Sequence, residues 1–272
     1  MRTSAVFALA LMSAALSLHA QDHRPPGARI AALSGASCAL VAETWSAQAN
    51  PASLAACTSM AAAAFLTPAP FGLGELRTAG VAAAYPVSGA VLGGSLYRFG
   101  FDLYHETGFS LACGLRASGG LAVGGSVHLR FVEIARYGGR LAWSADLGAV
   151  VELAGGLWIG AGARSLWGAA ILLPGQDLPT SISAAIAASP RENTLIIAEI
   201  EREEGFDPSA KFGVECAVVA GLTLRGGWAT NPETFSAGIA VRVGALGFAY
   251  AGSLHAELGW THAIELQLKG GD

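Results

Sequence analysis

The sequence predicts an all-β fold, an antiparallel transmembrane β-barrel of about fourteen strands, on the basis of three observations. The chain is 53% hydrophobic and only 13% charged, whereas about a quarter of the residues in an average soluble domain are charged. After Ala20, no uninterrupted apolar run approaches the length that a membrane helix needs. Apolar and polar residues instead alternate, which is the period of a β-strand. Hydrophobicity that is high but dispersed in this way is typical of a membrane barrel.

The N-terminus, residues 1–20, has the pattern of a secretion signal. Arg2 supplies a positive charge, Val6–Leu16 is apolar, and Leu18-His19-Ala20 resembles a cleavage site. A transmembrane anchor is disfavoured because the apolar stretch is shorter than the roughly 20 residues of a spanning helix. The mature chain is therefore expected to leave the cytoplasm, and we expect it in the outer membrane of a bacterium.

The segment Arg140–Leu153 shows the alternation clearly. Its odd positions hold no charge, and its even positions hold all three of its charges, Arg140, Asp146 and Glu152. One face must therefore meet an apolar medium while the other meets water or polar partners. A soluble β-sandwich would also satisfy this pattern, so other features of the chain have to distinguish the two folds.

Similar segments follow one another across residues 58–269, which we predict to be the barrel. Tight turns rich in Gly and Pro alternate with longer links, as expected for a barrel that passes repeatedly through an outer membrane. This regular alternation of connections favours a barrel over a sandwich. The predicted strands are 58–66, 76–85, 89–99, 104–116, 121–133, 140–153, 156–166, 180–188, 193–202, 209–219, 221–230, 234–243, 245–253 and 257–268.

Charges of both signs fall on the strand faces opposite the apolar ones, and we expect them to line the lumen. An unpaired buried charge costs several kcal/mol, so these side chains should pair across the lumen or meet water. The candidate lumen charges are Arg130, Arg140, Asp146, Glu152, Arg164, Glu215, Arg225, Arg242 and Glu265.

Aromatic residues near strand ends or on outward faces are expected to form the interfacial girdles of a barrel. The alternative is packing in the core of a sandwich. The residues concerned are Trp143, Trp158, Trp167, Trp228, Tyr250 and Trp260.

The sequence contains no motif that predicts an enzyme. A Gly-x-Ser-x-Gly elbow, a phosphate-binding loop and a His-Glu-x-x-His zinc pattern are all missing from it. The histidines are scattered without ligand spacing, and Glu106 beside His105 is interpreted as an outer-loop residue. We therefore expect no catalytic residue, no metal and no cofactor. The net charge of −4 gives no basic surface for nucleic acid.

The four cysteines fall into two pairs of different character. Cys113 and Cys216 lie on apolar strand faces and are interpreted as small lipid-facing residues. Cys38 and Cys57 lie in or beside the N-terminal element and could form a disulfide in an oxidising compartment. Spacing alone does not decide between a bridge and two free thiols.

Two stretches of the chain carry a resemblance to a known family. The segment Ala28–Ala55 is similar to the N-terminal plug of the FadL-like outer-membrane long-chain fatty-acid transporter superfamily, particularly its PorV/PorQ branch. The segment Phe248–Leu268 resembles the closing hairpin of the same family. The matching motifs are, in order, Ala28-Arg29, Ser34-Gly35-Ala36, Glu43-Thr44-Trp45, Asn50-Pro51-Ala52, Leu258-Gly259 and Thr261-His262.

The resemblance implies that residues 21–57 fold inside the barrel as a plug, or hatch. Pro51 fixes its φ angle and removes an N–H donor, while Asn50 can bond nearby backbone, which suits a fixed turn in a lumen. The alternative for Asn50-Pro51-Ala52 is an ordinary turn before a strand. Ser34 departs from the family pattern, in which a second glycine is usual at this position.

The resemblance also implies a function. Relatives of the PorV/PorQ type act in protein secretion or surface attachment, with secretion-machinery or cargo proteins as partners beside outer-membrane lipid. The alternative is transport of hydrophobic small molecules, such as fatty acids, across the outer membrane, although the short loops offer little surface for their capture. A purely structural envelope barrel is a third interpretation.

Overall fold

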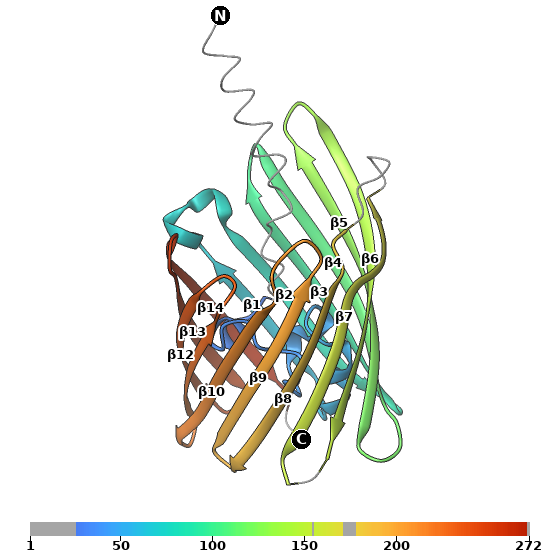
Figure 1. The fold of residues 1–272 in the computed structure, drawn as a ribbon, viewed down its shortest axis with the longest axis vertical. Coiled ribbons are helices and arrows are strands. Elements are labelled where there is room, and N and C mark those ends of the chain that lie inside the picture. Colours follow the sequence, from blue (N-terminus) through green and yellow to red (C-terminus); the bar gives the residue numbers. More distant parts are fainter. Residues whose placement is uncertain (1–25, 154, 171–177, 271–272) are drawn as a thin grey trace, which may run out of the picture.

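A computed structural model describes residues 26–153, 155–170 and 178–270 of the chain. The expected secretion signal, residues 1–20, and the first residues of the expected plug lie outside this described part. Fourteen antiparallel strands form one closed barrel, which confirms the predicted fold class (Figure 1). Every predicted strand is present, with bounds that differ from the prediction by a few residues at most.

The strands follow the chain around the barrel in order, and their bounds are as follows. They are β1 (Ala61–Thr67), β2 (Thr78–Val87), β3 (Ala90–Phe101), β4 (Tyr104–Arg116), β5 (Leu121–Ile134), β6 (Gly138–Glu152), β7 (Leu157–Ala170), β8 (Ser181–Arg191), β9 (Thr194–Glu203), β10 (Ser209–Val219), β11 (Leu222–Ala229), β12 (Thr234–Val243), β13 (Leu246–His255) and β14 (Gly259–Lys269).

The barrel closes between its first and last strands. β1 pairs with β14 from Ala61 opposite Lys269 to Leu66 opposite Ile264. Each strand is thereby paired with a neighbour on both sides, as a β-structure in a hydrocarbon environment requires, although β7 pairs with β8 only as far as Arg164. No helix in the described part of the chain is both long enough and apolar enough to cross a membrane.

The alternation read from the sequence becomes an apolar outer wall. On β8, Ile182 and Ile186 point outward and are 61% and 47% exposed, while Ala185 and Ala187, on either side of Ile186, are buried inside. The same division holds on β4, where Ser110 and Ala112 are buried and Leu111 is exposed. A closed wall with apolar side chains outward is the architecture of an outer-membrane β-barrel.

The two ends of the barrel differ in their connections. One end, called here the short-turn end, holds tight turns such as residues 88–89 and 244–245. The other, the long-loop end, holds residues 68–77, with the 3₁₀ turns η3 (Pro70–Gly72) and η4 (Gly74–Leu76), although the β3–β4 turn there is also tight. The wall is uneven, since β6 has 15 residues and β1 has 7, and the β5–β6 hairpin rises above its neighbours (Figure 1).

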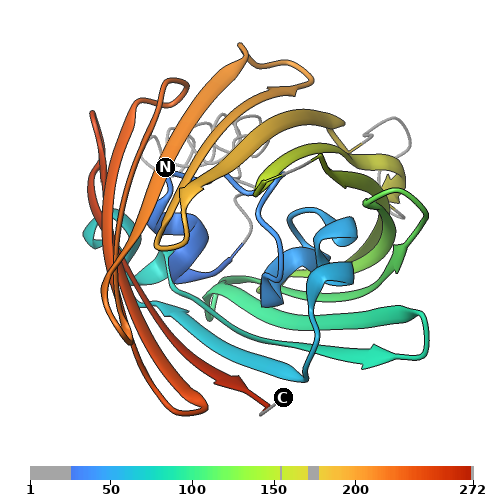
Figure 2. The same ribbon diagram turned by 90° about the horizontal axis from the view of Figure 1, so that it is seen from below.

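Residues 26–57, called here the luminal segment, lie inside the barrel (Figure 2). They contain the short helix α2 (Ala28–Ala32) and the 3₁₀ helices η1 (Thr44–Ala47) and η2 (Pro51–Ala56). Most of their side chains are fully buried, and η2 packs against β3–β6.

Glycines on the inner wall allow this close packing. A Cβ atom on Gly124 or Gly148 would collide with the turn at Asn50-Pro51, and one on Gly160 would collide with the carbonyl of Cys38. These wall positions therefore need glycine because the luminal backbone approaches them directly.

Candidate functional site

A cavity of about 430 Å³ lies between the luminal segment and the long-loop end of the barrel. This upper cavity has residues of α2, Ile30 and Ala31, in its floor. Its walls come from strands on several sides of the barrel and from the 68–77 connection. Its position makes it the candidate site for a small molecule that enters from the long-loop end.

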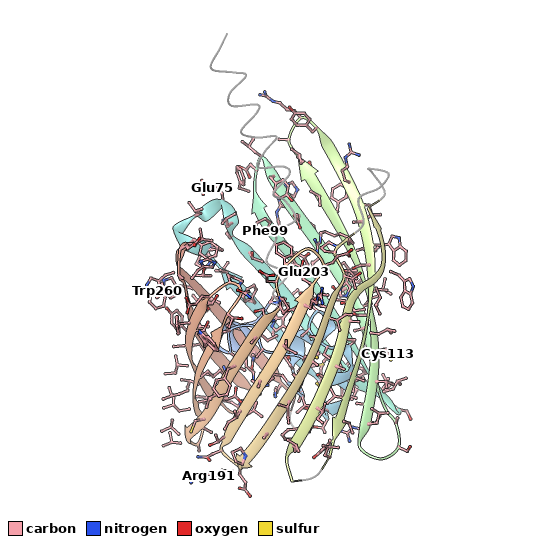
Figure 3. All side chains as sticks on the ribbon, viewed as in Figure 1. Glu75, Phe99, Cys113, Arg191, Glu203 and Trp260 are labelled. Carbon is pink, nitrogen blue, oxygen red and sulfur yellow. The ribbon has the colours of Figure 1, made fainter. Side chains whose placement is uncertain are left out.

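One side of the upper cavity is aromatic. Phe65 on β1 and Tyr97 and Phe99 on β3 occupy inward positions, and Phe71 comes from the 68–77 connection. Phe71 packs edge-on against His255 with ring centroids 5.8 Å apart. In Figure 3, Phe99 lies near the long-loop end, and Trp260 projects from the outer wall.

A neighbouring part of the upper cavity, formed by β4–β7, is polar. His128 Nδ1 lies 2.7 Å from Ser110 Oγ, and His128 Nε2 lies 2.8 Å from Asp146 Oδ2. Asp146 Oδ1 also accepts a hydrogen bond of 2.8 Å from the Ser165 N–H. These contacts resemble a catalytic triad, but Ser110 is only 1% exposed. The cluster is a hydrogen-bond network that joins β4, β5, β6 and β7.

A bulge between β6 and β7 places Asp146 at this point. Ala145 is paired with Trp167 and Leu147 with Ala163, so the segment Arg164–Leu166 bulges opposite Asp146. Ser165 has a φ of 53°, and its N–H points to the Asp146 carboxylate.

Glu106 is an inward residue of β4 and not the outer-loop residue expected from the sequence. It is 3% exposed and accepts a hydrogen bond from the Tyr104 hydroxyl. Arg130 Nε lies 3.8 Å from Glu106 Oε2. The expectation was wrong because the even positions of β4 all face the lumen, and Glu106 follows that parity.

Glu215 and Arg225, two of the predicted lumen charges, form an ion pair across β10 and β11, with Arg225 Nε 2.6 Å from Glu215 Oε2. Arg29 of α2 binds the same carboxylate through Nε at 2.9 Å and Nη2 at 3.0 Å. Its Nη1 also lies 3.4 Å from Glu43. Although burial opposes the charged form, Glu215 and Glu43 raise the pKa of Arg29 above its ordinary value. Strand alternation could not predict this role of Arg29, because Arg29 lies in the luminal segment and not in a strand.

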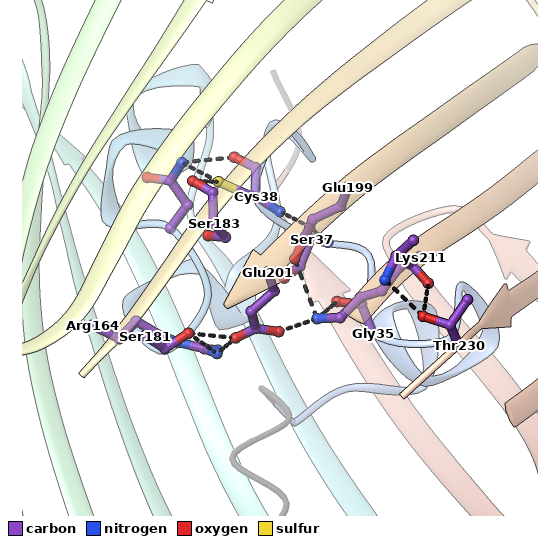
Figure 4. Close-up of polar contacts among 12 residues, drawn as sticks. Gly35, Ser37, Cys38, Arg164, Ser181, Ser183, Glu199, Glu201, Lys211 and Thr230 are labelled. Carbon is purple, nitrogen blue, oxygen red and sulfur yellow. Dashed lines mark hydrogen bonds and ion pairs between the residues drawn. The ribbon is translucent and has the colours of Figure 1, made fainter. Parts of the chain in front are cut away.

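A second charge cluster surrounds Glu201 on β9 (Figure 4). Arg164 from β7 and Lys211 from β10 each form an ion pair with Glu201, and Ser181 donates a hydrogen bond to it at 2.7 Å. Arg164 was among the predicted lumen charges, whereas Glu201 and Lys211 were not. The cluster neutralises charge inside the wall, as expected for buried carboxylates and cations.

Glu199 connects this cluster to the luminal segment (Figure 4). Its Oε2 accepts hydrogen bonds from the N–H groups of Ser37, at 2.7 Å, and Cys38, at 2.8 Å. Lys211 Nζ lies 3.2 Å from Glu199 Oε1 and 3.4 Å from the Gly35 carbonyl. Charges of the wall therefore hold the turn at residues 35–38 in place.

The other predicted lumen charges have different surroundings. Glu265 is fully buried and accepts hydrogen bonds from the Ala28 N–H at 2.5 Å and from Gln267 Nε2 at 2.6 Å. Within the described residues it forms no ion pair. Arg140, Glu152 and Arg242 lie near strand ends, and their side chains are exposed.

Asn50-Pro51-Ala52 forms the start of η2. Asn50 is fully buried, and its Oδ1 accepts a hydrogen bond of 3.1 Å from the Ala52 N–H, with Pro51 in the first turn. Its Nδ2 donates to the carbonyls of Cys38, at 2.6 Å, and of Ala149 and Ala161, each at 3.3 Å. Asn50 thus joins two parts of the luminal segment to β6 and β7.

Leu258-Gly259 and Thr261-His262 lie at the long-loop end of β14. Leu258 is exposed in the turn before the strand, and Gly259 has a φ of 92°, which favours glycine. Thr261 Oγ1 accepts a hydrogen bond of 3.2 Å from the Phe71 N–H. His262 faces outward, stacks on Trp260 and lies 2.7 Å from the Tyr250 hydroxyl.

All four cysteines are free thiols, so the possible bridge between Cys38 and Cys57 is not formed. Burial raises the pKa of each of these two thiols to about 11, and both are therefore protonated at neutral pH.

Among the described residues, no group of three His, Cys, Asp or Glu side chains could hold a metal ion.

Trp158 departs from the expected girdle, since it lines a cavity inside the barrel.

No family model matches the sequence, and no curated protein matches it closely. The fold is nevertheless similar to those of solved structures. The Ralstonia pickettii toluene transporter TbuX has a TM-score of 0.72 at 12% identity, covering 92% of this chain and 100% of its own. The P. putida toluene transporter TodX has a TM-score of 0.69 at 12% identity, covering 91% and 97%.

A Pseudomonas aeruginosa FadL homologue has a TM-score of 0.62 at 10% identity, covering 90% of this chain and 98% of its own. At these identities the likeness concerns the fold. The barrel is therefore of the same kind as theirs, and the resemblance to the FadL-like superfamily and its PorV/PorQ branch stays a prediction.

Proposed function

We propose that this protein is an outer-membrane channel for hydrophobic small molecules, with the long-loop end facing outward and the luminal segment acting as its plug. The observation that carries the proposal is the upper cavity, an aromatic-sided space of about 430 Å³ above a buried plug. Ligand sites for apolar molecules are typically concave and mostly apolar, with polar groups that fix orientation. The lining surface of the upper cavity is mostly apolar, and Glu106, His128 and Asp146 are among its polar residues.

The charge distribution of the lumen supports a plugged channel over an open aqueous pore. Arg29, Glu215 and Arg225 are paired with one another, and so are Glu201 and Lys211. Paired charges hold the luminal segment to the wall and leave few charges to attract ions into a water-filled pore. A molecule that binds on the aromatic side of the upper cavity would therefore not need to pass unpaired charges.

The solved structures with similar folds also support transport of a hydrophobic small molecule as the proposed function. Two of them are toluene transporters by name, and a third is a FadL homologue. The secretion-linked function, first among the expectations from the sequence, stays a prediction, because no contact or surface in the described residues favours it over transport.

Phe99 and Leu96 provide a matched test of the proposal, since they lie three residues apart on opposite faces of β3. Phe99 lines the upper cavity, and Leu96 has outward parity and is 47% exposed. In detergent-solubilised protein, Phe99→Ala should weaken binding of toluene or oleate about tenfold, because loss of an aromatic contact surface costs about 1.5 kcal/mol. Leu96→Ala should bind like the parent protein.

Transport itself is measured by uptake of radiolabelled toluene or oleate into vesicles that contain the protein. We expect uptake faster than that of empty vesicles, with Phe99→Ala slower than Leu96→Ala. Uptake equal to that of empty vesicles, together with no binding of either probe, would reject the channel function.

A further inference from the structure

A second cavity, of about 220 Å³, lies between the luminal segment and the short-turn end of the barrel. This lower cavity is bordered by the β8–β9 turn, at Glu192 and Asn193, and by the ends of β10 and β11, at Ala217 and Thr223. It is therefore on the opposite side of the luminal segment from the upper cavity.

The helix α2 separates the two cavities. Ile30 and Ala31 line the upper cavity, and their neighbour Arg29 lines the lower one. α2 has five residues, so a single short helix stands between the two spaces at this point. A molecule in the upper cavity would reach the lower one by displacing this helix or its side chains.

The ion pairs at the boundary remove part of the cost of moving Arg29. Glu215 keeps a second cation, Arg225, whose Nε lies 2.6 Å away. Arg225 Nη1 is also buried without a hydrogen-bond partner among the described residues, so it is available to the Glu215 carboxylate. The penalty for an unpaired buried carboxylate would therefore not arise at Glu215 if Arg29 withdrew, and the remaining cost is the loss of the Arg29 contact with Glu43.

One side of the lower cavity is apolar. Ala39 and Val41 of the luminal segment, Trp158 on β7 and Leu195 on β9 line this side, and the rest of the lining is mostly polar, with Arg29, Glu192 and Glu215 among it. Trp158 is an inward residue that stays partly exposed, because it borders this cavity instead of packing against the luminal segment throughout. A partly exposed indole face inside a barrel is a surface on which a ring can stack.

We propose that the lower cavity is a second binding site for the transported molecule, occupied after it has passed α2, and that it accepts single-ring hydrophobic compounds but not long acyl chains. This inference rests on the channel function proposed above. The size limit follows from the volume of about 220 Å³, since a cavity of roughly 150 Å³ is enough for benzene. Passage to the periplasmic side is thereby restricted to molecules smaller than those that the upper cavity admits.

Bromobenzene is a suitable probe, because the anomalous scattering of bromine locates it in crystals of the protein. We expect bromine at both cavities, with Trp158 beside the lower one. Bromine in the upper cavity alone would overturn the second site and leave the channel function standing. Bromine in neither cavity would count against the channel function itself.

Substitutions at Leu195 and Ile196 give a matched functional test. Leu195 lines the lower cavity, whereas Ile196 is the next residue of β9 and points to the opposite face. We expect Leu195→Trp to fill the cavity and lower toluene uptake into vesicles about tenfold or more. Ile196→Trp should retain the parent rate.

Folding of both variants is checked by bromobenzene binding in the upper cavity, which neither substitution touches. A Leu195→Trp protein that binds in the upper cavity and still takes up toluene at the parent rate would overturn the proposal. A smaller, shape-preserving variant, Leu195→Phe, serves if the tryptophan variant does not fold, and an intermediate loss of uptake is then expected.

Discussion

Asn50 shows how strongly a single side chain can fix the luminal segment. Its amide satisfies four backbone groups, one in its own helix, one at Cys38 and one on each of β6 and β7. A turn that is fully buried has no water to replace these bonds, so the polar groups around it depend on the amide.

Asn50→Ala is therefore expected to destabilise the folded protein by about 1–3 kcal/mol, the cost of leaving buried backbone groups without partners. The free energy of unfolding, measured by urea titration of protein folded in vesicles, gives the value. The control is Asn193→Ala, since Asn193 is exposed in a turn, where its side chain bonds the Ala217 carbonyl and the Thr194 hydroxyl and water can replace both. Equal stability of the two variants would show that the Asn50 contacts do not hold the segment.

At the scale of single residues, the sequence predicted which face of a strand each charge occupies but not its partner or its height along the strand. Asp146 was expected to pair with a charge across the lumen or to meet water, and it binds His128 of the adjacent strand. Arg140 and Glu152 share its parity, yet they lie near the two ends of β6 and are exposed. Alternation shows whether a side chain points into or out of the barrel. The height of that side chain along the barrel depends on how the strands pair.

At the scale of elements, the strands and turns could be predicted well because each depends on local pattern. The luminal segment is different, since its position depends on contacts with residues far along the chain, such as Arg29 with Glu215. The glycines of β5–β7 carried a signal that was available in the sequence. Gly124 and Gly148 fall on inward positions, where a missing side chain leaves space for another backbone.

Gly124 and Gly125 are adjacent on β5 and test this packing. A Cβ at Gly124 would collide with the Pro51–Ala52 peptide, whereas a Cβ at Gly125 would meet Leu147 Cδ2 at an ordinary 3.5 Å. We expect Gly124→Val to displace η2 and raise the ionic conductance of the barrel in planar bilayers severalfold, because the lumen is then less filled. Gly125→Val should conduct like the parent protein. The same low conductance in both variants would contradict a role for the luminal segment in filling the barrel.

At the scale of the whole molecule, a charge placed on the apolar outer wall should destabilise the folded protein. The loss of stability should be larger near the middle of the membrane than near its surfaces. Ile186 lies in the middle of β8, and Ile182 lies near its long-loop end on the same outward face. Ile186→Arg is expected to destabilise the protein in vesicles by about 2–4 kcal/mol, and Ile182→Arg by about 0–1 kcal/mol. Urea titration of both variants measures the difference. Equal costs would mean that the wall does not contact hydrocarbon.

The closed barrel itself followed from composition, alternation and turn spacing, since these properties are repeated in every strand. What could not be predicted is how the lumen is divided. Trp158 shares the parity of the predicted lumen charge Arg164, so alternation placed it on the inner face, and the expectation of a girdle residue followed its place near a strand end instead. The packing of β7 shows that it borders an internal cavity.

The unequal walls affect the way the protein sits among lipids. At about 3.3 Å per residue and a tilt near 45°, the 15 residues of β6 span about 35 Å and the 7 residues of β1 about 16 Å. A bilayer of uniform thickness cannot match both strand lengths, so the barrel tilts or the bilayer beside β1 becomes thinner. In either case the mouth opens obliquely toward the lipid headgroups on its low side. Compounds already dissolved in the outer leaflet then have a shorter journey to the lumen than those arriving from water.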